Sequence, residues 1–300
     1  MEWIRERLEL NPEDTCQQTE ELLRDMLQKL GSDGLLIGLS GGLDSAIVAY
    51  LSVRSIGKEK VTLLNLPDRD SKGIHQRHAK LIARDLGVQL QIKDITPIIK
   101  EVGAYDLLPT IYLPSRRLRG LAGQLGKLLL EGDDNVFFTR LRSAPNTLIA
   151  KGNAYAMIKH RIRMVLLYYH AEISNLMVVG AANKTEFLTG TFCKWGCDQC
   201  ADVMPILHLY RSQLLPIAEY LNVPEKIRTK PADPDIIPGV DNKEEGLLGS
   251  FLKTDEILWG LENGIDAEEM YSYFGQEKVE RIQSLREVSR HMRESPYVVG

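Results

Sequence analysis

The hydrophobic pattern along the chain alternates between short apolar runs and segments with apolar residues at helical spacing. Short runs of strand length lie at residues 35–39, 61–66, 88–92 and 176–179. Segments typical of helices lie at residues 13–30, 75–86, 152–170, 210–221 and 255–293. Strands that alternate with helices predict an α/β fold with a doubly wound parallel sheet and flanking helices.

Residues 34–50, GLLIGLSGGLDSAIVAY, combine a buried strand, a glycine turn and a helix start. Backbone N–H groups and the helix dipole make such a junction an anion site. Gly41 and Gly42 allow close backbone approach to a phosphate, and Ser40 and Ser45 offer hydroxyl donors. Asp44 would repel a phosphate, which points to a bridging Mg²⁺. No Lys follows the glycines, so this is not the GxxxxGK[ST] phosphate loop.

In a parallel sheet, ligands bind at the carboxyl ends of the strands, where residues 40–45 and 67–71 both lie. We predict one domain over residues 1–300, with a helical insertion at about 105–142 and a helical tail at about 255–300. The insertion carries Pro109, Pro114 and the basic run 116–119. It is read either as a helical excursion on the surface or as a cap over a phosphate-bearing substrate.

Composition narrows the class of protein. The 300 residues are 44% hydrophobic and 26% charged, which is typical of a globular protein. A net charge of −4 gives no general attraction to nucleic acid or anionic lipid. No apolar run reaches membrane-spanning length, and the charged first residues do not resemble a signal peptide, so we expect a cytoplasmic protein.

The loop SGGLDS after an apolar strand resembles the ATP loop of the N-type ATP pyrophosphatases (PP-loop superfamily). Further motifs are similar to those of ammonia-dependent NAD synthetases: GN at 152–153, RIRM at 161–164, NKTE at 183–186, AD at 201–202, PI at 205–206, LY at 209–210, VPE at 223–225, PG at 238–239 and SxHxRxxP at 289–296. The resemblance covers residues 34–95 and 152–296.

The resemblance implies a mechanism and a set of site residues. ATP adenylates the carboxylate of deamido-NAD, pyrophosphate leaves, and ammonia displaces AMP. ATP contacts are expected at Ser40, Gly41, Gly42, Asp44, Ser45, Leu66 and Arg211, with Mg²⁺ at Asp44 and Glu186. Deamido-NAD contacts are expected at Arg161, Lys194, Asp202 and His291, and catalytic roles at Asp44, Glu186 and Lys194. The family also implies a homodimer, with free ammonia or a separate glutaminase as nitrogen source.

Plainer structural roles stay open for three of these residues. Glu186 is also placed to cap its helix, Arg161 to pair with a carboxylate on a helix face, and His291 to be a surface histidine.

The chain departs from the family pattern at four single positions. Ala181 replaces a Thr, Arg211 a Lys, Asp233 a Ser or Thr, and Met292 a Lys. The first three are ATP contacts in the family, so ATP handling or substrate closure is expected to differ. A carboxylate at Asp233 would repel ATP unless Mg²⁺ or an arginine lay between them.

The largest departure is the loop that holds Cys193, Cys197 and Cys200, three of the four cysteines in the chain. Three thiolates at CxxxCxxC spacing can hold a [4Fe–4S] cluster or Zn²⁺, or they remain unligated. A cluster would favour a rival function, a sulfurtransferase that replaces an oxygen of an adenylated substrate with sulfur. A nucleotide-binding sensor is a third hypothesis, for which Asp44 together with Glu186 would be unnecessary.

Overall fold

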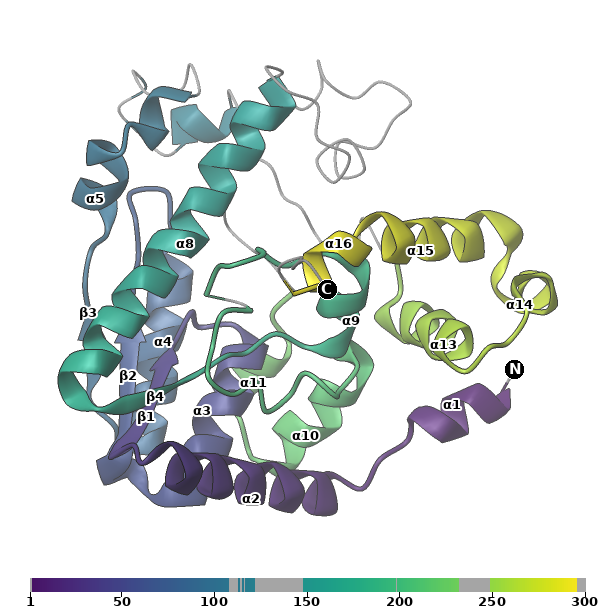
Figure 1. The fold of residues 1–300 in the computed structure, drawn as a ribbon, viewed down its shortest axis with the longest axis horizontal. Coiled ribbons are helices and arrows are strands. Elements are labelled where there is room, and N and C mark those ends of the chain that lie inside the picture. Colours follow the sequence, from purple (N-terminus) through teal and green to yellow (C-terminus); the bar gives the residue numbers. More distant parts are fainter. Residues whose placement is uncertain are drawn as a thin grey trace, which may run out of the picture.

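A four-stranded parallel sheet organises the protein (Figure 1). The computed structural model describes residues 2–107, 113, 115, 117–121, 148–197, 199–231 and 249–295, without the side chains of 148 and 149. The strands are β1 (Gly34–Gly38), β2 (Val61–Asn65), β3 (Leu90–Ile92) and β4 (Leu176–Val179). Their order is β3-β2-β1-β4, with Leu36 of β1 opposite Thr62 and Val178. The chain runs outward from β1 in both directions, which confirms the predicted α/β fold.

Helices flank the sheet and form the C-terminal part. The N-terminal helices are α1 (Glu2–Leu8), α2 (Pro12–Leu30), α3 (Leu43–Ile56), α4 (Gly73–Leu86) and α5 (Thr96–Glu101). Those that follow are α8 (Leu148–Ser174), α9 (Lys184–Thr189), α10 (Leu214–Tyr220), α11 (Glu225–Arg228), α13 (Phe251–Glu262), α14 (Ala267–Phe274), α15 (Gln276–Val288) and α16 (Arg290–Arg293). Short 3₁₀ turns are η1 (Lys58–Lys60), η2 (Ala104–Leu107) and η4 (Arg211–Gln213).

Successive side chains of a strand point to opposite faces of the sheet, so β1 contributes to two apolar clusters. Leu35 and Ile37 pack with residues of α2, α3, α4 and α10 on one face. Leu36 packs on the other face with residues of α5, η2 and α8. Because both faces are covered, the strands read as continuous apolar runs rather than as alternating patterns.

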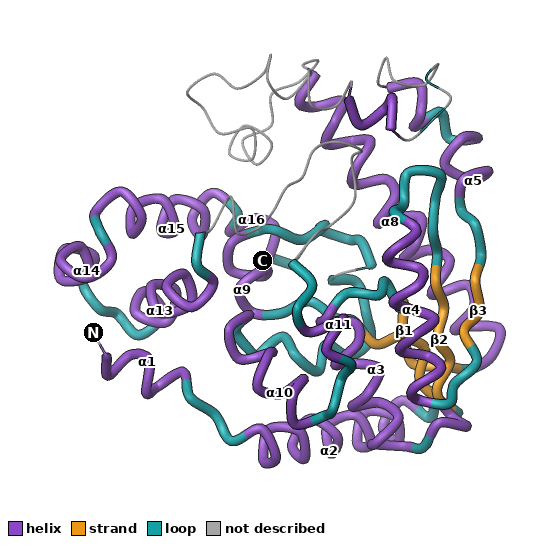
Figure 2. The backbone as a smooth tube through the Cα atoms, turned by 180° about the vertical axis from the view of Figure 1, so that it is seen from behind, coloured by secondary structure: helices purple, strands orange, loops and turns teal. Residues whose placement is uncertain are grey.

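A third apolar cluster lies in the C-terminal helices. Residues of α13, α14 and α15 pack with α1 and α9 around Ile257, Met270 and Ile282. Figure 2 shows these helices at the opposite side of the molecule from strands β1–β3. The short helix α16 packs against α9, so the chain turns back from α15 to the middle of the molecule (Figure 1).

Several predicted boundaries shift. The helix expected at 210–221 is the turn η4 followed by α10, and α1 was not predicted. In the range 105–142 the structure describes only a few positions, among them a helical turn at 117–121, so Pro109, Pro114 and Arg116 lie outside the described residues. Asp198, Asp233 and residues 238–239 and 296 also lie outside them. Across the described chain, none of the helices has the length and apolarity needed to cross a bilayer.

Candidate active site

The predicted ATP loop leaves β1 and enters α3 in a tightly fixed conformation. Gly41 has φ +83°, and a Cβ there would lie 2.2 Å from the backbone oxygen of His75 in α4. Only glycine satisfies both conditions. The hydroxyls of Ser40 and Ser45 lie 2.9 Å apart, and the N–H of Gly42 donates to Ser40 Oγ at 3.2 Å. The sequence thus places two hydroxyls and a helix N-terminus around one point, as an anion site requires.

A cavity of about 310 Å³ opens beside this loop at the carboxyl edge of the sheet. It is lined by nine predicted site residues: Ser40, Gly42, Asp44, Ser45, Leu66, Glu186, Arg211 and, from the cysteine loop, Cys193 and Cys197. The substituted position Ala181 also lines it. The structure therefore brings the predicted ATP residues from four separate segments together around one space.

Asn183 links the two carboxylates that were predicted to hold Mg²⁺. Its side chain donates to Asp44 Oδ2 at 2.7 Å, while its backbone N–H donates to Glu186 Oε2 at 3.2 Å. Asn183 Oδ1 in turn accepts from the N–H of Glu186, so Glu186 does close a capping box on α9. Capping and metal binding are compatible, because a carboxylate has lone pairs left over. The carboxylates of Asp44 and Glu186, joined by Asn183 at the cavity wall, suit a hard cation such as Mg²⁺.

Arg211 replaces the lysine of the family pattern and still reaches the ATP loop. Its Nη1 lies 3.4 Å from Asp44 Oδ1, and its guanidinium lies over the ring of Phe251. Both side chains are mostly buried. A positive charge is therefore kept at the cavity. It is carried by a planar guanidinium group with several N–H donors instead of by the compact ammonium of a lysine.

Three of the four residues predicted to bind deamido-NAD gather at the C-terminal segment. Lys194 Nζ donates to the backbone oxygen of His291 at 2.5 Å, and Arg161 Nη2 donates to the backbone oxygen of Lys194 at 3.4 Å. Asp202 is engaged elsewhere, where it accepts from the N–H of Val178 at 2.7 Å and from the hydroxyl of Tyr168 at 3.1 Å. The roles of all four in substrate binding stay predictions.

Met292, which replaces the family lysine, has a structural explanation. It is buried in the same apolar cluster as Leu188 and Phe192. A lysine there would bring an ammonium group into that cluster.

The cysteine loop lies beside the cavity, but its thiols face different partners. Cys193 is buried with its sulfur 3.7 Å from the backbone oxygen of Met157, and Cys197 Sγ lies 3.5 Å from His160 Nδ1. Burial, with the charge of Asp202 adding to it, raises the pKa of the Cys200 thiol. Among the residues that the structure describes, no three His, Cys, Asp or Glu side chains form a group that could hold a metal ion.

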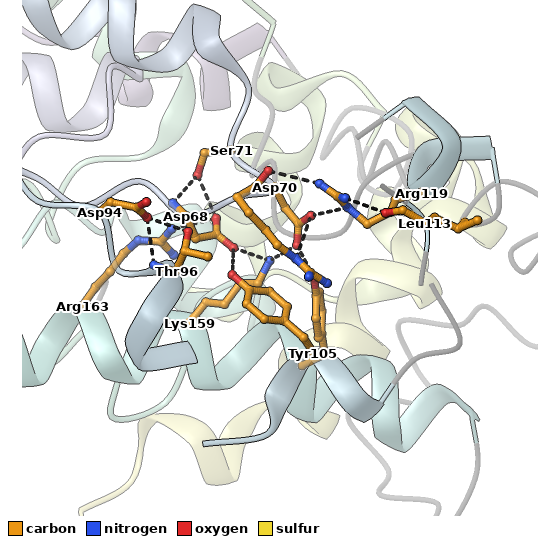
Figure 3. Close-up of polar contacts among 12 residues, drawn as sticks. Asp68, Asp70, Ser71, Asp94, Thr96, Tyr105, Leu113, Arg119, Lys159 and Arg163 are labelled. Atoms are coloured by element: carbon orange, nitrogen blue, oxygen red, sulfur yellow. Dashed lines mark hydrogen bonds and ion pairs between the residues drawn. The ribbon is translucent and has the colours of Figure 1, made fainter. Parts of the chain in front are cut away.

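A buried ion network, absent from the sequence-based prediction, supports the other wall of the cavity (Figure 3). Lys159 of α8 is fully buried, and its Nζ lies 2.8 Å from Asp68 Oδ2 and 2.9 Å from Asp70 Oδ2. Arg119 donates to Asp70 Oδ1 at 3.0 Å, and the hydroxyl of Tyr155 donates to Asp70 Oδ2. Both aspartates lie in the loop after β2, so the network fixes that loop against α8 and the turn 117–121.

The network reaches the cavity through Arg163. Its Nε donates to the backbone oxygen of Leu66 at 2.9 Å, and its Nη2 lies 3.6 Å from Asp68 Oδ1. Burial would raise the pKa of Asp68, but Lys159 and Arg163 outweigh that effect and hold this pKa below its ordinary value. Arg163 and Leu66 both line the cavity, so the charges of the network set the position of a predicted ATP contact.

The cavity wall carries further basic residues that the prediction of site residues missed. Lys230 and His75 both line it, with Lys230 Nζ 2.6 Å from His75 Nδ1. Lys230 belongs to the same segment as the substituted position Asp233, which was the only sequence signal for it. The ammonium of Lys230, together with Arg211 and the serine hydroxyls of the loop, suits a polyphosphate.

A doubly wound parallel sheet whose first strand leads into an SGGxDS loop defines a nucleotide-binding protein of the PP-loop class. Two carboxylates and several cations converge there on one cavity. Within that class, the sequence matches the NAD synthase family over residues 15–108 and 125–296, and the chain belongs to that family.

Similar proteins from bacteria and archaea support this family assignment. The chain is 39% identical over 272 residues to the NH(3)-dependent NAD(+) synthetase of Thermotoga neapolitana, covering 90% of this chain and 91% of the relative. It is 32% identical to the NH(3)-dependent NAD(+) synthetase of Methanocaldococcus jannaschii over 259 residues, which is 86% of this chain and 85% of the relative.

Solved structures share the fold. The NMN synthetase of Francisella tularensis superimposes with a TM-score of 0.70 at 24% identity, over 97% of this chain and 99% of that chain. The NH3-dependent NAD synthetase of Campylobacter jejuni gives a TM-score of 0.69 at 23% identity, over 97% and 100%.

Proposed function

We propose that the protein catalyses ATP-dependent amidation of deamido-NAD to NAD with ammonia, through an acyl-adenylate, with release of AMP and pyrophosphate. Membership of the NAD synthase family makes it an ATP-dependent ligase. The observation that carries the proposal is the convergence of the SGGxDS loop, Asp44, Glu186 and Arg211 on one cavity.

The chain's own groups have definite parts in the adenylation step. The hydroxyls of Ser40 and Ser45 and the N-terminus of α3 bind the phosphates, and Arg211 faces them across Asp44. Asp44 and Glu186 are the residues that would hold Mg²⁺, and this ion, when bound, offsets charge on the leaving pyrophosphate. The apolar cavity walls formed by Leu66 and Met157 keep water from the acyl-adenylate, which is a reactive mixed anhydride.

We propose that deamido-NAD is bound by Lys194, Arg161 and His291, and also by Asp202, whose carboxylate accepts from the N–H of Val178. The support is the chain of contacts from Arg161 to Lys194 and from Lys194 to His291. Two cations next to the C-terminal segment suit the pyrophosphate and carboxylate of a dinucleotide.

No specific observation favours sulfur transfer. A cluster-bearing site would need three thiolates that face one point, whereas Cys193 and Cys197 contact different residues and burial raises the pKa of Cys200. Iron–sulfur or zinc binding therefore stays a sequence-based hypothesis, which the cysteine variants described in the Discussion test.

We propose a homodimer that uses one face of α8. Val165, Tyr169 and Ile173 follow each other at four-residue spacing, and each is more than half exposed. Three large apolar side chains in one stripe of a helix are typical of an interface. A cytoplasmic location stays a prediction.

The test is a product assay with ATP, Mg²⁺, ammonium and deamido-NAD. NAD and AMP should form in equal amounts, with none formed when any one reactant is omitted. Asp44→Asn and Glu186→Gln should each lower kcat by roughly 10²-fold or more, because several kcal/mol of charge stabilisation depends on them. Glu277→Gln, at an exposed position of α15, is the matched control and should leave the rate unchanged. AMP release without NAD would refute the proposal.

A further inference from the structure

A buried carboxylate outside the cavity joins three segments that bear on the ATP site. Asp255 of α13 is 0% exposed. Its Oδ1 accepts from Thr185 Oγ1 at 2.5 Å, and its Oδ2 accepts from the N–H of Ser212 at 2.7 Å. Thr185 Oγ1 itself accepts from the N–H of Arg211 at 2.8 Å. These contacts connect α9, η4 and α13, which are 26 to 70 residues apart along the chain.

The hydrogen-bond directions explain why this residue is an aspartate. The N–H of Ser212 can only donate a hydrogen bond. The hydroxyl of Thr185 accepts from the N–H of Arg211, so its own hydrogen is left to be donated to a second partner. Both neighbours therefore need an acceptor, and an ionised carboxylate offers two. An asparagine has one acceptor and would set an NH₂ group against one of them.

These two donors stabilise the ionised form of the Asp255 carboxyl group. Burial raises the pKa of Asp255 to about 6, while the hydrogen bonds from Thr185 and Ser212 act in the opposite direction. The group is therefore largely ionised at neutral pH, in the state that accepts both bonds. An ionised group without solvent contact is costly unless its bonds are kept, so the arrangement is rigid.

The two residues that Asp255 contacts are each next in the chain to a residue that lines the cavity, Glu186 or Arg211. Thr185 directly precedes Glu186, and the N–H that Thr185 binds belongs to Arg211, whose guanidinium lies 3.4 Å from Asp44. We infer that Asp255 is a positioning residue of the ATP site, which fixes Glu186 and Arg211 relative to each other through the hydroxyl of Thr185. Because Asp255 lies on α13, its contacts with Thr185 and Ser212 also tie the C-terminal helices to nucleotide binding. The inference rests on the proposed function only where it is tested by KM values; the test by analogue binding does not need turnover.

Two isosteric variants and one conservative variant test the relay. Asp255→Asn removes one acceptor, and Thr185→Val removes the hydroxyl at constant shape. Each should raise KM for ATP about tenfold or more, as expected for loss of a hydrogen bond to a charged group, with KM for deamido-NAD changed less than threefold. Thr185→Ser keeps the hydroxyl and should restore KM for ATP to within about threefold of wild type.

Calorimetric titration of a non-hydrolysable ATP analogue, with Mg²⁺ and with EDTA, gives a readout that needs no turnover. Asp255→Asn and Thr185→Val should weaken analogue binding, and the double variant should weaken it no more than the worse single variant, because both break one relay. The folding of each variant is checked by circular dichroism and by its Tm. If Asp255→Asn does not fold, the analogue affinity of Thr185→Val tests the inference.

Two results would overturn the inference. One is a folded Thr185→Val or Asp255→Asn protein with wild-type analogue affinity. The other is an equal rise in KM for both substrates, which indicates a general structural role. A wild-type protein that forms no NAD but binds the analogue would refute the proposed function alone, since the calorimetric comparison still decides the role of Asp255.

Discussion

Replacing the buried Lys159 by methionine is the most informative perturbation of the network beside the cavity. The variant keeps the length of the side chain but leaves Asp68 and Asp70 without the ammonium that they share at 2.8 and 2.9 Å. Removing one partner of a buried ion pair typically costs 3–5 kcal/mol. Arg119 and Arg163 stay close to the two carboxylates, so we expect the lower end, about 3 kcal/mol.

The assay is urea unfolding at pH 7 and at pH 4.5, with Lys151→Met as control, because Lys151 lies on the same helix but is exposed. In wild type the pKa of Asp68 is lowered, so its contribution to stability is present at neutral pH and is lost as pH falls through that pKa. In the variant Asp68 loses one of the two cations that lower its pKa, so it binds protons more readily than in wild type. The stability difference between wild type and Lys159→Met should therefore shrink toward pH 4.5.

A second variant makes the test specific to charge. Lys159→Met combined with Asp70→Asn removes one uncompensated charge and should recover part of the lost stability. A Lys159→Met protein as stable as the Lys151→Met control at pH 7 would refute the reasoning, as would a deficit that stays the same at both pH values.

Three further predictions follow from the site and the surface. Gly41→Ala should lower ATP-analogue affinity at least tenfold in calorimetry, because the left-handed backbone and the 2.2 Å approach to α4 leave no room for a Cβ; wild-type affinity would contradict this. Cys197→Ala and Cys200→Ala should keep NAD formation within a few-fold, with iron and zinc far below one per chain in anaerobically purified wild type; a brown protein whose activity both variants abolish would favour the sulfurtransferase. Val165→Glu with Ile173→Glu should convert a dimer to a monomer in light scattering, whereas a dimer that persists would place the interface elsewhere.

The ATP loop could be predicted because its information is local. An apolar strand, a glycine pair and a helix start within residues 34–50 determine the conformation almost alone. The same holds for the capping box of Asn183 and Glu186, which spans four residues. Family resemblance then related these local motifs to one another.

The ion network could not be predicted in the same way. Lys159 reaches Asp68 and Asp70 across about ninety residues of sequence, and no local pattern encodes that contact. The segment 152–170 was predicted as a helix, but the prediction assigned no partner to Lys159. One signal was nevertheless present, because Lys159 lies at helical spacing from Tyr155 and Ile162, which are buried. A lysine on an apolar helix face requires a buried partner.

The most direct test of the account follows one oxygen atom. Deamido-NAD labelled with ¹⁸O in its carboxylate is converted with ATP and ammonium, and AMP is analysed by mass spectrometry. If that carboxylate attacks the α-phosphorus of ATP and ammonia then displaces AMP, each AMP molecule carries one oxygen from the carboxylate. Unlabelled AMP, formed together with NAD, would contradict the acyl-adenylate and with it the role assigned to the cavity.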